Sequence, residues 1–533
     1  MWGLSGETFR NKKIKRYLCQ TETVAKVNSL KRIVRSRLGD RPAKRNTEQY
    51  YIIIDMTANK QMRTEGDLLG DRQLPADALY GVQTLRGMEN FQISNFKLSQ
   101  YPYFIQGLAY TKWGAAIANH SEGILTDEQY EAIVFACKEL IAGKHHDAFE
   151  VDMIQGGAGT TTNMAANEVI CNIALQKMGH KPGEYKFLAP NDGVNASQST
   201  NDAYPTAIHL GLYPKGLEVY KHVEQLIAAL RAKAEEMKHV LKIGRTQLQD
   251  AVPMTLGQTF HGFASILEDE LPRLKSACEE FLTVNMGATA IGTGIASEPG
   301  YAEACVEALS EITGWPVKLS ADLVGATSDT SVMIGYSSAL RRIAVKINKI
   351  CNDIRLLSSG PRAGIGEFNV PAVQPGSSIM PGKVNPVIPE VMSQVCYKVM
   401  GNDTTVLMAG DAAQMELNAM EPVMAQCCFE SSDLMMHGIT TLIERCITGI
   451  TPNEERCRQQ IEASITIVTA LNPIIGYKNS TKIAKEALET GKGIYELVLE
   501  HGILDKKDLD EVMDPKHMTQ PSKLDHIKPK KQL

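Results

Sequence analysis

Residues 336–357 read YSSALRRIAVKINKICNDIRLL, and their apolar side chains recur in alternating steps of four and three residues. The apolar positions are Tyr336, Leu340, Ile343, Ile347, Ile350, Ile354 and Leu357. Basic residues such as Arg341 and Lys349 lie outside this seam. A seam with this spacing is typical of a long helix that packs along nearly parallel helices.

The same spacing returns earlier in the chain, between residues 217 and 241. Its apolar positions are Tyr220, Val223, Ile227, Leu230, Ala234, Met237 and Leu241. Residues 257–284 and 389–408 also lack the alternation of a strand, and helices of this length cross about 30–40 Å. The sequence therefore predicts a mainly all-α protein with a long central helical bundle. Because long seams leave apolar faces that one chain does not cover, we also expect self-association.

The composition is that of an ordinary globular protein, since 43% of the 533 residues are hydrophobic and 22% are charged. Disordered, collagen-like and disulfide-scaffold classes are therefore excluded. No window holds the ~18 consecutive apolar residues of a membrane helix, so no membrane association is expected. The 11 Cys form no CxxC pair, which favours free thiols in a reducing cytoplasm over disulfides or a zinc site.

The net charge of −5 is unevenly distributed along the chain. Residues 1–60 carry 14 Lys and Arg against 5 Asp and Glu, which gives +9 and leaves −14 for the remainder. An acidic body is not expected to bind nucleic acid, because binding needs a basic surface. The basic segment lacks the apolar core of a secretory signal. It could resemble a transit peptide or bind acidic partners, but we favour the interpretation that residues 1–55 are a basic extension, disordered or not native.

Loops rich in Gly and small polar side chains interrupt the predicted helices. They are residues 155–163, 190–202 and 360–386, and a fourth segment, 244–250, follows a long helix. Ser199 precedes an apolar helical pattern, so the backbone N–H groups of that helix start would face outward and could bind an anion. One such loop would be an ordinary cap, but several in one chain favour a site for a small, doubly anionic ligand.

The loop around Lys383 differs from the known phosphate and dinucleotide loops. Five residues separate Gly376 from Gly382, and Val384 stands where a P-loop has Ser or Thr. Gly292 and Gly294 form only part of a dinucleotide fingerprint. No HExxH motif or His/Cys cluster indicates a metal, no Ala-Ser-Gly tripeptide supplies a self-made electrophile, and no cofactor is expected. The remaining hydroxyls, amides and lysine suit removal of a proton next to a carboxylate, with fixed donors holding the developing charge.

Residues 376–386, GSSIMPGKVNP, resemble the signature loop of the fumarase/aspartase superfamily. Further similar segments follow the superfamily order along the chain, at Gly159-Thr160, Ser199-Thr200-Asn201 and Gly244-Arg-Thr246. The resemblance covers about residues 63–520. Within the superfamily it is closest to the aspartate ammonia-lyase family, at residues 68–70, 75–86, 383–390 and 401–405.

The resemblance implies reversible β-elimination of ammonia from L-aspartate to give fumarate through an enediolate. Gln247 favours this reaction over that of class II fumarase, because hydroxide is a poor leaving group that needs a general acid. Gln247 donates no acidic proton but can hold an ammonium through its carbonyl oxygen. The alternatives are class II fumarase and a catalytically inactive structural oligomer, although the latter would be expected to lack Ser377, Lys383 or Asn385.

The resemblance also assigns roles to individual residues. Ser377 would be the general base. The enediolate at the β-carboxylate would be held by Thr160, Ser199, Thr200 and Ser378. Lys383, Asn385 and Thr246 would bind the α-carboxylate, Asn201 and Gln247 would orient the amine, and Glu390 would support the loop.

The superfamily architecture implies three domains after the extension. These are a mostly helical N-terminal domain over 56–198, a central long-helix bundle with the signature loop over 199–451, and a small C-terminal helical domain and tail over 452–533. Four identical chains would pair their bundles into a twenty-helix core, with each site built from three subunits.

Overall fold

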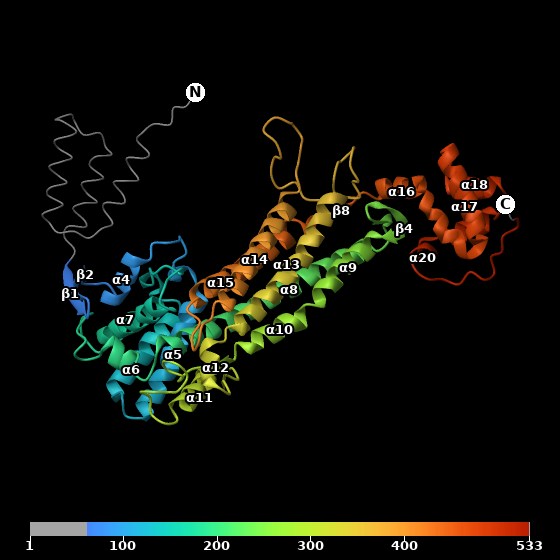
Figure 1. Cartoon of the computed structure of the whole chain (residues 1–533). Helices are drawn as coiled ribbons and strands as arrows, with labels where there is room; N and C mark the ends of the chain where they lie inside the picture. The colour runs from blue at the N-terminus through green and yellow to red at the C-terminus, as the bar shows by residue number, and fades with distance from the viewer. Residues whose placement is uncertain (1–60, 532–533) are drawn as a thin grey trace, which may run out of the picture. The chain divides into compact units, whose positions relative to one another are not determined.

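The computed structural model describes residues 61–531 (Figure 1). The chain divides into two compact units, Met1–Ala78 and Leu79–Leu533. The described part of the first unit is an antiparallel hairpin of β1 (Met62–Asp67) and β2 (Gly70–Pro75). The predictions for residues 1–55 lie outside the described residues.

The second unit is mainly helical, which confirms the predicted fold class. Its helices are α4 (Val82–Asn90), α5 (Pro102–Ser121), α6 (Asp127–Ile141), α7 (Thr160–Lys177), α8 (Thr200–Glu236), α9 (Leu256–Glu268), α10 (Leu271–Glu280), α11 (Tyr301–Thr313), α12 (Leu323–Ser328), α13 (Ser331–Leu357), α14 (Val387–Asp411), α15 (Glu421–Arg445), α16 (Glu454–Ala463), α17 (Asn472–Thr490), α18 (Ile494–Glu500), α19 (Lys506–Val512) and α20 (Pro515–Met518). Among residues 61–531, no helix has the length and apolar character needed to cross a membrane.

Three short strand pairs accompany these helices. The antiparallel pairs are β3 (Leu241–Thr246) with β4 (Gln249–Thr255) and β7 (Phe368–Asn369) with β8 (Thr451–Pro452). The parallel pair is β5 (Thr283–Val284) with β6 (Lys318–Leu319). The pairs β5–β6 and β7–β8 join segments that are distant in sequence, whereas β3–β4 is a hairpin between α8 and α9.

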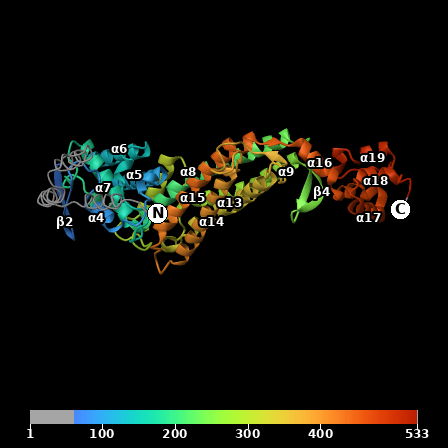
Figure 2. The same cartoon turned by 90° about the horizontal axis from the view of Figure 1, so that it is seen from above.

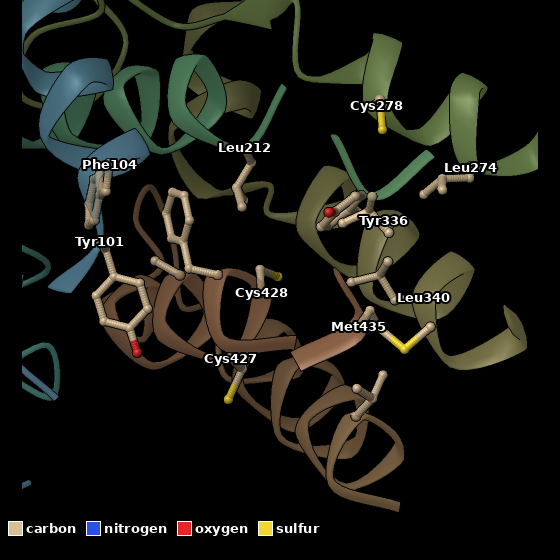
Figure 3. Packing of buried hydrophobic residues seen from close by; sticks show 14 of the residues in the cluster. Tyr101, Phe104, Leu212, Leu274, Cys278, Tyr336, Leu340, Cys427, Cys428 and Met435 are labelled. Carbon is tan, nitrogen blue, oxygen red and sulfur yellow. The ribbon is translucent and has the colours of Figure 1, made fainter. Parts of the chain in front are cut away.

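Helix α13 contains the predicted seam, and every seam residue from Tyr336 to Leu357 is buried. The helices α8, α13, α14 and α15 lie side by side in both views (Figures 1 and 2). Tyr336 and Leu340 point into a core shared with Met435 of α15 and Leu212 of α8 (Figure 3). The Tyr336 hydroxyl also forms a 2.8 Å hydrogen bond with Ser432, so its polar end is satisfied inside this core.

The second predicted seam is confirmed except at its end. Val223 and Leu230 of α8 are fully buried, but the helix ends at Glu236. Leu241 begins strand β3, so the prediction of one helix through residue 241 was wrong. The reason is tertiary, because Leu241 pairs with Thr255 across the hairpin and contacts the C-terminal helices.

The predicted segment 257–284 is divided into α9 and α10. The break lies at residues 269–270, and Pro272 occupies the first turn of α10, where its missing N–H is tolerated. Glu270 at this break is almost fully buried and accepts hydrogen bonds from Arg342 of α13 at 2.7 and 2.9 Å. Lys346 lies 2.5 Å from the same carboxylate. The ion-pair group therefore fixes the α9–α10 corner to α13.

Helices outside the bundle pack at its two ends, where α5–α7 share its main hydrophobic core and α11 packs with α5 in a smaller one. Glu168 of α7 accepts the backbone N–H groups of Gly81, Gln83 and Thr84, and so caps α4 from a distant segment. At the other end, helices α16–α20 pack around Leu471 and Leu497 together with Ile243 of β3. The boundaries at 198/199 and 451/452 fall at the cap of α8 and within β8, and they stay predictions.

Candidate functional site

A strained backbone turn precedes α7. Gly157, Ala158 and Gly159 have φ angles of 90°, 52° and 89°. A Cβ atom at Gly159 would lie 2.4 Å from the ring of Tyr204, so this position requires glycine. Thr160 follows as the exposed first residue of α7, and its hydroxyl donates to the Gly157 carbonyl oxygen at 2.7 Å. The turn thus presents the N-terminus of α7 to solvent.

Helix α8 begins with the predicted cap. The Ser199 hydroxyl accepts the backbone N–H of Asn201 at 3.2 Å, and the Asp202 carboxylate accepts the N–H of Ser199 at 2.9 Å. Pro205 cannot donate to the Asn201 carbonyl oxygen, as a residue four positions along a helix otherwise would. The side-chain amide of Asn285 donates to that oxygen instead, at 3.0 Å. This start of α8 is therefore built by tertiary contacts as well as by its own sequence.

The side chain of Asn201 is partly engaged by the loop that follows β5. Its Nδ2 donates to the carbonyl oxygen of Ala290 at 2.7 Å, which leaves Oδ1 as the atom able to accept from an ammonium group. Asp202 accepts the N–H groups of Gly287 and Thr289 at 3.0 and 3.1 Å. Burial raises the pKa of Asp202 to about 6 although these N–H groups oppose the shift.

The starts of α7 and α8 are joined by one amide side chain. Nδ2 of Asn163, in the first turn of α7, donates to the Thr200 hydroxyl at 3.2 Å. We call the predicted residues of these two helix starts the α7/α8 group. Its members are Thr160, Ser199, Thr200 and Asn201. Two helix N-termini that open beside several hydroxyls make a suitable place for a carboxylate.

Thr246 and Gln247 lie at the tip of the β3–β4 hairpin, which the sequence did not predict as a hairpin. Thr246 pairs with Gln249, so Gln247 and Leu248 form the two-residue turn. Their φ angles are 54° and 63°. Such turns favour Asn and Gly, so a Gln-Leu turn carries backbone strain. Strain of this kind is common at functional sites, and the Gln247 side chain is exposed at the tip.

The signature loop closes on itself between Gly376 and Asn385. The Gly376 N–H donates to the Lys383 carbonyl oxygen, and Asn385 Nδ2 donates to the Gly376 carbonyl oxygen, both at 2.9 Å. A Cβ atom at Gly376 would lie 2.3 Å from the Lys383 oxygen, so only glycine allows this approach. One N–H of Asn385 is therefore used to close the loop, and its second N–H is left for a ligand.

The hydroxyl oxygen of Ser377 accepts hydrogen bonds from two backbone N–H groups. Its Oγ accepts the N–H of Ile379 at 3.2 Å and the N–H of Met380 at 2.9 Å. Hydrogen bonds to the anionic form favour an alkoxide over a hydroxyl. Ser378 and Lys383 are exposed on the same loop. Glu390 stands in the first turn of α14 directly after the loop, and its N–H donates to the Pro386 carbonyl oxygen at 3.3 Å.

The predicted residues form three groups, and they are divided between the two ends of α8. The α7/α8 group lies at the N-terminal end of α8, whereas the hairpin follows the C-terminal end. Helix α8 has 37 residues, so its ends are about 55 Å apart. The signature loop starts from β7, which pairs with β8, and Lys233 near the C-terminal end of α8 donates to the Ile450 carbonyl oxygen at 3.0 Å. The base of this loop is thus on the hairpin side of the bundle.

One cavity lies near the predicted residues of the hairpin. A cavity of about 310 Å³ beside the hairpin contains none of the predicted site residues. It is lined by Arg245, Asp250, Gly364, Ile365, Arg456, Gln460 and Ala463. In the described part of the chain, no group of three or more His, Cys, Asp or Glu side chains is arranged to hold a metal ion.

Sequence reasoning missed the polar residues that support the α7/α8 group from behind. These are Lys112, Asn163, Asn195, Asp202 and Asn285. The available signal was Lys112, a single lysine among the small and apolar residues between Gly107 and Ala118. A lone cation in such a helix segment is unusual, because burial of an unpaired charge is unfavourable.

Comparison with known proteins relates this arrangement to characterised families. A family model described as Lyase matches residues 70–401, and one described as Fumarase C C-terminus matches residues 467–520. The aspartate ammonia-lyase of Pseudomonas canavaninivorans is 54% identical over 467 residues, which cover 87% of this chain and 98% of the relative.

Two solved structures extend the comparison to the fold. The fumarate lyase:delta crystallin of Brucella melitensis, bound to cobalt, has a TM-score of 0.84 and 49% identity, covering 86% of this chain and all of that one. The recombinant class II fumarase of Schistosoma mansoni has a TM-score of 0.81 and 32% identity, and the match covers 87% of this chain and 100% of the fumarase chain.

Proposed function

Because the chain belongs to the aspartate ammonia-lyase family of the fumarase/aspartase superfamily, we propose that it converts L-aspartate reversibly to fumarate and ammonia. The observation that carries the proposal is the environment of Ser377. Its Oγ accepts two backbone N–H groups within a closed loop, which is the arrangement a serine needs to act as a base. Aspartate and fumarate are the small-molecule partners, and the mechanism requires no cofactor.

The reaction begins with proton removal from the carbon next to the β-carboxylate of aspartate. The Ser377 alkoxide takes this proton, and the electron pair of the C–H bond moves into the carboxylate to give an enediolate. The α7/α8 group and Ser378 hold the added negative charge, since donors fixed before the reaction need no reorganisation. Two helix N-termini add to this effect.

The second step breaks the carbon–nitrogen bond. The enediolate electrons return to form the double bond of fumarate, and the bonding pair of the C–N bond leaves with the nitrogen as ammonia. The amine is already protonated in the substrate, so no acid is needed for its departure. Gln247 and the Oδ1 atom of Asn201 would orient it, while Lys383, Asn385 and Thr246 hold the α-carboxylate and Glu390 supports the loop.

The separation of the α7/α8 group from the hairpin supports a site shared between copies of this chain. A span of about 55 Å along α8 is far greater than the length of a four-carbon dicarboxylate. Helix α14 also exposes large apolar side chains in the single chain, at Val391, Tyr397, Leu407 and Met408. We therefore propose the homotetramer with a twenty-helix core and sites built from three subunits. Because no disulfide links the ten buried thiols of the described part, a cytoplasmic location is part of the proposal.

Class II fumarase is the second candidate activity. Sequence similarity favours it less, since the Schistosoma mansoni fumarase is 32% identical to this chain whereas several aspartate ammonia-lyases are 50–55% identical. Gln247 in the strained hairpin turn also lacks an acidic proton for hydroxide. A structural protein without activity is disfavoured because Ser377, Lys383 and Asn385 are all present.

The activity is tested by ultraviolet detection of fumarate from L-aspartate, with L-malate assayed in parallel. Production of fumarate from aspartate alone supports the proposal. Production from malate alone would replace it by the fumarase activity. Ser377→Ala is the matched control, and it should lower kcat by about 10³-fold or more without changing the oligomeric state.

The shared site has a separate test by subunit mixing. One parent protein carries Ser377→Ala, and the other carries both Thr200→Ala and Asn201→Ala. Each parent should be inactive, but dissociation and joint reassembly should restore part of the activity, because some sites in mixed tetramers contain neither defect. Mixed tetramers without any recovery would show that each chain builds its own site.

A further inference from the structure

Lys112 is a buried cation behind the α7/α8 group. It lies on α5, and its side chain has no exposed surface. Its Nζ donates to the Oδ1 of Asn163 at 2.8 Å, the Oε1 of Gln198 at 2.8 Å and the Oδ1 of Asn195 at 2.9 Å. Three acceptors at these distances use all three N–H groups of an ammonium, and a neutral amine could not supply them.

The three amide acceptors belong to the segments that carry the predicted carboxylate-binding residues. Asn163 lies three residues after Thr160, and Gln198 directly precedes Ser199. Asn163 also donates to the Thr200 hydroxyl at 3.2 Å and to the Oδ1 of Asn195 at 3.1 Å. Lys112 is therefore two hydrogen bonds away from Thr200, and it ties the first turn of α7 to the loop before α8.

The charge of Lys112 is not neutralised by an ion pair. Among the described residues, no carboxylate lies within ion-pair distance of its ammonium. The charge of Asp202 raises the pKa of Lys112 from a greater distance. Burial lowers the pKa of Lys112 to about 7, and it raises that of Asp202 to about 6. An unpaired buried cation is unfavourable by itself, and two helix N-termini with the same sign of charge lie next to it. An anion bound in front of these helix starts would compensate the positive charge of Lys112 and the partial positive charges of both helix N-termini.

We propose that Lys112 is a positioning residue that aligns the α7 and α8 starts and favours the most negatively charged form of the ligand there. The inference rests on the proposed function, since the ligand is the β-carboxylate and its enediolate. The hydrogen bonds fix the geometry of the hydroxyl donors. The ammonium adds a fixed positive charge that interacts more strongly with the doubly charged enediolate end than with a carboxylate.

The test compares an enediolate mimic with a ground-state mimic. The nitronate form of 3-nitropropionate has two formally anionic oxygens on a planar C=N end, as the enediolate has on its C=C end, with a net charge of −1 on that end because the nitrogen is positive. The carboxylate of succinate shares one negative charge between its two oxygens. The measurement is the ratio of the inhibition constants of these two compounds in the assembled enzyme. We expect Lys112→Met to weaken nitronate binding about 100-fold and succinate binding less than about 10-fold. In the steady-state kinetics, kcat should fall while KM changes less than about 10-fold.

A matched control separates this effect from the general effect of removing a buried lysine. Lys233 on α8 is also buried, with 4% of its surface exposed. Its Nζ donates to the carbonyl oxygens of Thr448 and Ile450, and, unlike Lys112, it also forms an ion pair, with Glu236 at 2.7 Å. Lys233→Met should lower the thermal stability but leave the ratio of inhibition constants unchanged. If both variants moved the ratio equally, the inference would be overturned.

A second variant decides the question if Lys112→Met does not fold. Gln198→Glu keeps an oxygen acceptor for Nζ and supplies a carboxylate that neutralises the ammonium in place. It also removes the two hydrogen bonds that Nε2 of Gln198 donates to the carbonyl oxygens of Val194 and Ala196, so folding of the variant is checked by circular dichroism first. We expect a folded tetramer whose nitronate binding is weakened by about 10-fold more than its succinate binding. A folded variant at either position with the wild-type ratio would overturn the inference. If the wild-type enzyme formed no fumarate from aspartate, the proposed function itself would fail, which is a separate result.

Discussion

Glu421, the first residue of α15, is a buried acid whose ionisation should limit stability at alkaline pH. Only 4% of its surface is exposed, and burial raises its pKa from 4.5 to about 8. In the unfolded chain the same carboxyl ionises near its ordinary pKa. Between these two values the folded state binds more protons than the unfolded state, so stability falls as the pH rises.

The size of the effect follows from the difference between the two pKa values. A difference of 8 − 4.5 corresponds to about 5 kcal/mol at 1.36 kcal/mol for each pKa unit, reached only above pH 8. Glu421→Gln keeps the shape of the protonated acid and cannot ionise. We therefore expect the variant and the wild type to be nearly equal in stability at pH 5. At pH 9 the variant should be more stable, by about 5 °C for a chain of this size.

The assay is thermal unfolding of both proteins from pH 5 to pH 9, with the difference in Tm as the readout. The difference cancels the contributions of all other titrating groups. Glu416→Gln is the matched control, because Glu416 is an exposed glutamate five residues earlier, and its difference in Tm should stay small and independent of pH. A Glu421→Gln difference that does not change between pH 5 and pH 9 would refute the argument that Glu421 is buried as a neutral acid.

Four further outcomes are expected. Glu270→Gln should destabilise the fold by about 1–2 kcal/mol at pH 7, because Arg342 and Lys346 lower the pKa of Glu270 to about 2. The effect is limited to this size because both cations are partly exposed to solvent. Urea unfolding should show that this contribution disappears as the pH falls from about 4.5 to 2. Leu248→Gly should raise the Tm of the protein by relieving a φ of 63°, an effect of about 1 kcal/mol that calorimetry can measure. Met408→Glu should dissociate the assembly in sedimentation experiments, since this side chain is 69% exposed on α14 in the single chain. The same variant should lose most of its turnover, whereas a chain that builds its own site would keep it.

The helical bundle could be predicted because its signal is local. All seven seam positions between Tyr336 and Leu357 are buried in α13, since the spacing that identifies them is itself the geometry of the contact. The end of α17 has a local cause too, since Gly491 has the left-handed φ of 72° that ends a helix. The cap at Ser199 follows from the same kind of local chemistry.

The remaining features depend on contacts between distant residues. The β3–β4 hairpin was missed because its turn is Gln247-Leu248 and not Asn-Gly, so the usual turn signal is absent. The end of α8 was missed because Leu241 continues the apolar spacing but pairs with Thr255 in a strand. The residues behind the α7/α8 group were missed for a similar reason. Lys112 meets its partners across more than 50 residues of sequence, and no local pattern records this contact.

Buried charges in this chain are compensated in different ways, and the difference separates structural from functional roles. Glu367 is fully buried and paired with Lys242 at 2.9 Å and with Arg245, so its charge is balanced within the fold. Lys112 is equally buried but has only neutral amide oxygens around its ammonium. A fold that needed only rigidity could use an apolar side chain at that position, because a well-packed apolar group is often as stabilising as a buried ion. A positive charge without an ion-pair partner beside two helix N-termini is most useful when an anion binds there, which is the reason to assign Lys112 to the reaction and Glu367 to the fold.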